Sequence, residues 1–114
     1  MANKNSCALY CVSADYLFDF ENFQEGNEFC LQNNWLGVVY NDFNFDLLKK
    51  HIQNELINKV WVYDFNIFIS VLKNDSYILN FLELLDFYNV DLYVNNILQD
   101  IDVLLNEYLK KTWE

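Results

Sequence analysis

Short apolar segments alternate with longer amphipathic segments along this 114-residue chain, and this alternation constrains the fold more than any single motif. The chain has no proline and only two glycines, so nothing in it marks a linker between domains. The pattern predicts one α/β domain, residues 1–114, with a mainly parallel sheet and right-handed crossovers. The expected architecture is a three-layer α/β/α sandwich around four strands: Ala8–Ser13, Trp35–Tyr40, Val60–Asp64 and Val90–Val94.

Apolar residues recur at helical spacing between these strands, and polar residues suited to helix capping precede them. The stretch Phe65–Leu72 is apolar throughout most of its length. It leads to Asn74, Asp75 and Ser76, which are candidate helix caps. The expected helices are Asp15–Asn33, one from Asn44 or Asp46 to about Leu56, one from Asn74, Asp75 or Ser76 to about Asn89, and one of about Ile97–Lys111.

The first expected helix has an acidic outer side. Tyr16, Phe20 and Phe23 fall together on its apolar side, and the acidic residues lie away from them. The acidic side is therefore a candidate binding surface, made of Asp15, Asp19, Glu21, Glu25 and Glu28.

Charge narrows the range of partners. The chain has 17 acidic residues, 7 lysines and no arginine, for a net charge of −10. Such a chain repels nucleic acid and anionic membranes and favours basic partners. The segment Met1–Ser6 lacks the features of a signal peptide, and no apolar run approaches the roughly 18 residues of a membrane span. We therefore expect a cytoplasmic protein that binds neither nucleic acid nor membrane directly.

The cysteines do not predict a disulfide framework or a metal site. Cys7 and Cys11 lie four residues apart in an extended segment, about 13 Å, which is too far for a bridge. With Cys30 they are three in number, without zinc-ligand spacing, and His51 is the only histidine. We expect reduced, packed thiols, no metal and no cofactor.

Polar residues follow each expected strand, where α/β sheets bind ligands. A carboxylate cluster of Asp15, Asp42 and Asp64 would suit a divalent cation, as in a metal-dependent nuclease or a receiver-like domain. The alternative is that Asp15 and Asp75 cap helices and the other polar groups only complete turns, and the lack of a nearby lysine or histidine favours this alternative. The polar residues at these ends are Ser13 with Asp15, Asn41 with Asp42, Asp64 with Asn66, and Asn95 with Asn96.

Several segments resemble the N-terminal catalytic domain of the serine recombinases, the resolvase and invertase group. Leu9-Tyr10-Cys11-Val12-Ser13 is similar to the end of that family's first strand, which implies that Ser13 stands at the nucleophile position and Cys11 at an arginine position. Asp64-Phe65-Asn66-Ile67-Phe68 is similar to the family's Asp-Arg-x-x-Arg run, with Phe65 and Phe68 at the phosphate-binding arginine positions. Weaker similarities are Gln32–Trp35, Leu82–Leu92 and Gln99–Asp102, and Asn41–Asn44 stands where the family has a longer active-site loop.

The missing arginines predict a domain without catalysis. Phosphoryl transfer builds charge on non-bridging oxygens, and bidentate arginines stabilise it. Losing one such donor commonly costs about 10²–10³ in rate, and an unactivated serine is a weak nucleophile. Ser13 and Asp64 are therefore interpreted as vestigial, and the chain is not expected to be an enzyme.

Two functions remain, in a phage or mobile-element setting that the resemblance implies. The first is a regulator that binds an active recombinase, or a second copy, through the last helix (Leu104, Leu105, Tyr108) and an apolar patch at Phe65 and Phe68. The alternative for these phenylalanines is that they are core residues that close the emptied cleft. The second function is an acidic nucleic-acid mimic that inhibits a basic host defence enzyme, of the anti-CRISPR or anti-restriction type, through the acidic first helix.

Overall fold

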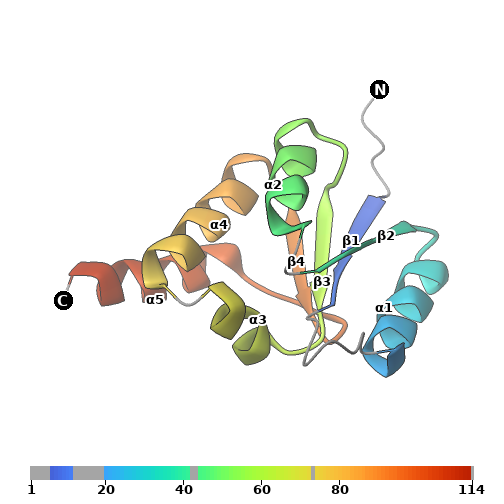
Figure 1. Ribbon diagram of the computed structural model, residues 1–114. Helices are drawn as coiled ribbons and strands as arrows, with labels where there is room; N and C mark the ends of the chain where they lie inside the picture. Colours follow the sequence, from blue (N-terminus) through green and yellow to red (C-terminus); the bar gives the residue numbers. More distant parts are fainter. Residues whose placement is uncertain (1–5, 12–19, 42–43, 73, 114) are drawn as a thin grey trace.

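The computed structural model describes residues 6–11, 20–41, 44–72 and 74–113, and Figure 1 shows a sheet with helices on both faces. The sheet has the order β2-β1-β3-β4-β5. The first four strands are parallel, and β5 runs antiparallel to β4. The α/β class and the mainly parallel sheet are confirmed. The strands are β1 Ser6–Tyr10, β2 Leu36–Tyr40, β3 Lys59–Val62, β4 Asp91–Val94 and β5 Ile97–Leu98.

The four-strand count is wrong because β5 was expected to be the start of the last helix. Asn95 and Asn96 both have positive φ, of 46° and 69°, and lie between the paired residues Val94 and Ile97. Two consecutive residues of this kind form a tight hairpin turn, which folds the chain back on β4. The last helix begins only at Ile101, where the Asp100 carboxylate accepts hydrogen bonds from two backbone N–H groups of the first turn.

Five helices lie in the described part of the chain. α4 is capped by Asn74, whose side chain accepts a hydrogen bond from the Ser76 N–H, as the sequence predicts. The stretch Phe65–Leu72, expected only to be apolar, is itself a helix. Of the first expected helix, Phe20–Gln32 is helical, and residues 15–19 lie outside the described residues. The helices are α1 Phe20–Gln32, α2 Phe45–Gln53, α3 Phe65–Leu72, α4 Asp75–Phe87 and α5 Ile101–Trp113.

The sheet separates two cores. On one face α1 covers Cys7, Leu9 and Trp61, together with Cys30 of the helix itself. On the other face α2, α3 and α4 cover a larger core, to which α5 adds Tyr108. Gly26 lets α1 approach the sheet closely, since a Cβ there would lie 2.8 Å from the Trp61 ring.

Candidate functional site

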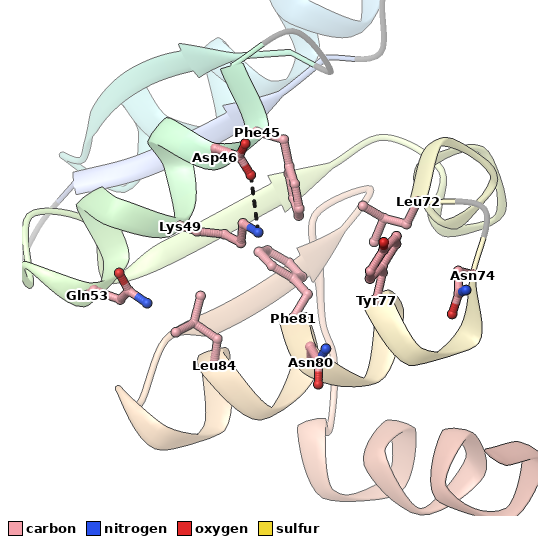
Figure 2. Close-up of a pocket in the computed structure, with 10 residues that line it drawn as sticks. All are labelled: Phe45, Asp46, Lys49, Gln53, Leu72, Asn74, Tyr77, Asn80, Phe81 and Leu84. Carbon is pink, nitrogen blue, oxygen red and sulfur yellow. Dashed lines mark ion pairs between the residues drawn. The ribbon is translucent and has the colours of Figure 1, made fainter.

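A groove of about 890 Å³ opens between α2 and α4 (Figure 2). The sequence analysis did not predict it, because its two walls come from helices that are far apart in the chain. Its floor is apolar and is formed by the partly buried Phe45 and Leu84 and the buried Leu72 and Phe81. The polar residues of the groove are Asp46, Lys49, Gln53, Asn74, Tyr77 and Asn80.

The charges in the groove are already paired. Lys49 Nζ lies 3.2 Å from Asp46 Oδ1 and 5.4 Å from the centre of the Phe45 ring. The remaining polar groups are neutral: the exposed amides of Gln53, Asn74 and Asn80 and the phenol of Tyr77, of which the Asn74 amide caps α4. Amides both donate and accept hydrogen bonds, as a peptide backbone requires, and the floor can receive apolar side chains. The groove therefore has the chemistry of a binding site for a polypeptide segment.

Just after the carboxyl end of β3, the Asp64 side chain forms hydrogen bonds with the backbone. Its Oδ1 accepts hydrogen bonds from the N–H groups of Asn66, at 2.8 Å, and Ile67, at 3.4 Å. These are the second and third residues of α3, so Asp64 caps this helix. The sequence predicted Asp64 only as a polar group of the strand-to-helix turn, and its role as a helix cap is a finding of the structure.

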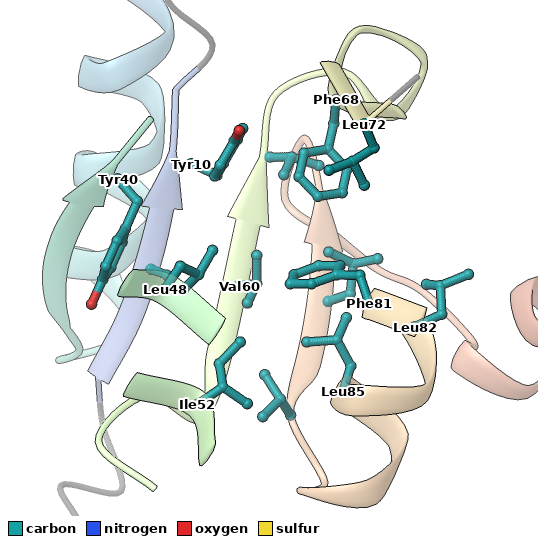
Figure 3. Packing of buried hydrophobic residues seen from close by; sticks show 14 of the residues in the cluster. Tyr10, Tyr40, Leu48, Ile52, Val60, Phe68, Leu72, Phe81, Leu82 and Leu85 are labelled. Carbon is teal, nitrogen blue, oxygen red and sulfur yellow. The ribbon is translucent and has the colours of Figure 1, made fainter. Parts of the chain in front are cut away.

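Phe68 is a core residue, 2% exposed, as the alternative interpretation had it (Figure 3). Its ring packs edge-on against Tyr10 at 4.9 Å between centroids and lies 5.5 Å from the ring of Phe81. Phe65 is half-buried and contacts the same core, 6.2 Å from Phe68. The interpretation of Phe68 as part of an exposed apolar patch is therefore wrong, because its side chain fills the core.

The other polar residues at the strand ends also stabilise turns. The Asn44 side chain accepts a hydrogen bond from the Asn41 N–H at 2.7 Å. Asn96 Oδ1 accepts from Trp61 Nε1 at 2.9 Å. Ser13, Asp15 and Asp42 lie outside the described residues. Within the described ranges, no three His, Cys, Asp or Glu side chains are grouped to hold a metal ion.

The candidate protein-binding residues divide into exposed and inward-facing groups. On α1, Glu25 and Glu28 are exposed, whereas Asp15, Asp19 and the Glu21 side chain lie outside the described part of the chain. On α5, Tyr108 is buried, and Leu104 and Leu105 are partly buried against the main core. Burial, and then the charges of Asp75 and Glu107, raise the pKa of Tyr108. The apolar side of the last helix therefore packs within its own domain.

The three cysteines are free and buried, as expected. Cys7 and Cys30 belong to the core under α1. A hydrogen bond with Cys30, together with burial, raises the pKa of the Cys7 thiol. Cys7 is fully buried and Cys30 nearly so, and both pack in the core under α1.

A buried tyrosine and the single histidine join β2 to α2. Tyr40 Oη and His51 Nδ1 are 2.6 Å apart, and burial raises the pKa of Tyr40. The two rings also meet edge-to-face, 5.8 Å between centroids. This pair fixes the position of α2 against the edge of the sheet.

Comparison of the chain with models of protein families, with curated proteins and with solved structures finds no match. No described helix is long and apolar enough to span a bilayer.

Proposed function

We propose that this chain is a non-catalytic regulator that acts by binding another protein, on a fold that resembles a serine recombinase catalytic domain without its active site. The observation that carries the proposal is the α2–α4 groove, with its apolar floor, neutral amides and internally paired charges. Two further observations support it. Asp64 caps α3, and Phe68 is core, so neither side chain is arranged to hold a phosphate.

The groove favours a basic partner segment with apolar anchors. The chain as a whole has a net charge of −10, which draws a basic protein toward it. Inside the groove, short-range packing against Phe45 and Phe81 and hydrogen bonds to Gln53 and Asn80 would then fix the bound segment. The partner is therefore a recombinase or another basic nucleic-acid-binding protein, recognised through one of its own segments.

A displayed library of random peptides tests this proposal. We expect selected peptides to combine basic and large apolar residues. We also expect them to bind the wild-type protein more tightly than variants with altered groove residues. Tyr77→Ala should weaken the binding more than about 10-fold, because aromatic residues at a binding site commonly contribute about 2 kcal/mol. Phe87→Ala is the matched control: it lies on the same helix and is similarly exposed, 77% against 62% for Tyr77, but is not part of the groove.

Equal effects of the two substitutions would contradict the groove as the binding site. Selection of acidic peptides, or of none, would contradict the proposed partner chemistry. Both variants change exposed side chains, so each should keep the wild-type circular dichroism spectrum.

The acidic mimic remains the second candidate function because most of the described carboxylates are exposed to solvent, including Glu25, Glu28, Glu83 and Asp86. A mimic held in a basic groove depends on charge alone, so its affinity should fall steeply with ionic strength. Binding through the α2–α4 groove should fall less, because part of it is apolar contact. Measuring affinity at about 0.05 M and about 0.5 M salt separates the two functions.

A further inference from the structure

The strand β2 forms an open edge of the sheet. Among the described strands it pairs only with β1. Its sequence, Leu-Gly-Val-Val-Tyr, contains no charge and no proline. Natural edge strands normally carry such residues to prevent pairing with another strand. An edge without them is a candidate site for strand addition.

The backbone of β2 directs alternate residues outward. The Tyr40 carbonyl accepts a hydrogen bond from the Cys11 N–H at 2.9 Å, so it points toward β1. Both backbone polar groups of one strand residue point to the same side, and the side alternates along the strand. Leu36, Val38 and Tyr40 therefore bond to β1, and Gly37 and Val39 present their N–H and C=O groups at the edge.

Exposed apolar side chains flank this edge on both faces of the sheet. Leu36 and Val39 belong to the strand itself. On α2, the exposed Leu47 lies one turn before His51, which contacts Tyr40 of β2. On α1, the exposed Leu31 lies one turn after Asn27, whose side chain oxygen would be 3.7 Å from a Cβ on Gly37. Leu31, Leu36, Val39 and Leu47 therefore form an exposed apolar strip along this edge of a strongly acidic protein.

We propose that β2 pairs with β2 of a second copy of this chain, antiparallel about a two-fold axis at Val38. In this register Gly37 of each copy lies opposite Val39 of the other. These are the residues whose backbone groups face outward, so four hydrogen bonds form between the copies. Val38 then faces its own counterpart at the axis, as a non-hydrogen-bonded pair.

The second copy fits this edge better than a basic protein does. In a two-fold interface the same surface of both copies is in contact. The apolar strip of Leu31, Leu36, Val39 and Leu47 would therefore pack against the same apolar strip of the second copy. Like charges on two acidic copies repel each other, so contact between copies is favoured where the exposed side chains are apolar, as they are in this strip. Gly37 also has no side chain to obstruct Val39 of the second copy.

Molar mass in solution tests the pairing. Multi-angle light scattering should give twice the 13.7 kDa chain mass for the wild type, and Val39→Lys should give the single chain mass. Val103→Lys on α5 is the matched control, since Val39 and Val103 are 40% and 53% exposed, and it should leave the dimer intact. Rising ionic strength should favour the dimer, in contrast to binding of a basic partner in the groove.

Cysteine cross-linking tests the register. Val38→Cys should form an intermolecular disulfide in mildly oxidising buffer, because opposed non-hydrogen-bonded residues have Cα atoms about 4.5 Å apart. Leu36→Cys should not, because its counterpart lies about 13 Å away in this register. A wild type that stays monomeric at every concentration, or a dimer that survives Val39→Lys, would overturn the proposal. Cross-linking of Leu36→Cys instead of Val38→Cys would overturn the register. None of these outcomes depends on the groove.

Discussion

Replacing Phe68 with arginine will unfold the domain or bring it close to unfolding. We expect the free energy of unfolding to fall by more than about 4 kcal/mol, because an unpaired guanidinium would enter an apolar core. Phe68 is almost fully buried among Tyr10, Phe45 and Phe81. Single domains have only about 5–15 kcal/mol of stability, so the loss is a large part of the total. Urea denaturation followed by circular dichroism measures it.

Ile67→Arg is the control for this experiment. Ile67 is the preceding residue on the same helix and is exposed, so arginine there should change stability by less than about 0.5 kcal/mol. A Phe68→Arg variant with the wild-type urea midpoint would contradict this account. It would mean that the core around Phe68 can accommodate a charged side chain without loss of stability.

Trp61→Ala should be the second most damaging change, costing about 3–5 kcal/mol. The side chain is fully buried beneath α1, and its indole N–H donates to Asn96 in the turn before β5. Truncation leaves a cavity in the smaller core and removes the partner of the Asn96 side chain. The drop in the urea midpoint, measured at unchanged slope, reports the loss.

Gly26 provides a coupled test of the same contact. In the wild type, Gly26→Ala should destabilise, because overpacking against Trp61 costs about 1–3 kcal/mol and exceeds the gain of about 1 kcal/mol from better helix propensity. In the Trp61→Ala background the clash with the ring is gone, and the remaining close atom is the end of the flexible Leu9 side chain, at 3.0 Å, which can move into the vacated space, so the same substitution should stabilise. If Gly26→Ala has the same sign in both backgrounds, close packing of α1 on Trp61 is not what requires glycine there.

The sequence predicted the elements whose signals are local. The helical spacing of Ile78, Phe81, Leu82 and Leu85 predicts that they share the inner side of one helix, and all four are buried. The cap at Asn74 was identifiable for the same reason, since a capping residue contacts only the next few backbone groups.

Signals that depend on unusual backbone geometry were missed. The turn at Asn95 and Asn96 contains no glycine, so the sequence does not indicate a hairpin there. The sequence pattern instead predicts that Ile97 begins the last helix, whereas Ile97 and Leu98 form β5. In α2, the spacing of the apolar residues predicts a helix that continues to about Leu56, with that side chain on its inner side. The helix instead ends at Gln53, Glu55 takes a positive φ of 59°, and Leu56 is exposed.

The features that depend on tertiary packing could not be predicted from the sequence. Phe65–Leu72 is too uniformly apolar to show a helical period, and its helix is defined by the cap at Asp64 and by packing of Phe68 in the core. Tyr108 was expected to contact a partner but is buried within its own domain. Helical periodicity shows which side of a helix is apolar, but not whether that side packs in the same domain or against another protein. The groove combines Phe45 with Phe81, which are brought together only by the fold.

Amide hydrogen exchange, with and without a selected peptide, tests most directly where this protein binds its partner. The account predicts slowed exchange in α2 and α4, over residues 45–53 and 77–84, and no change in α1, residues 20–32. Protection confined to α1 would contradict it and would assign the interaction to the acidic surface instead.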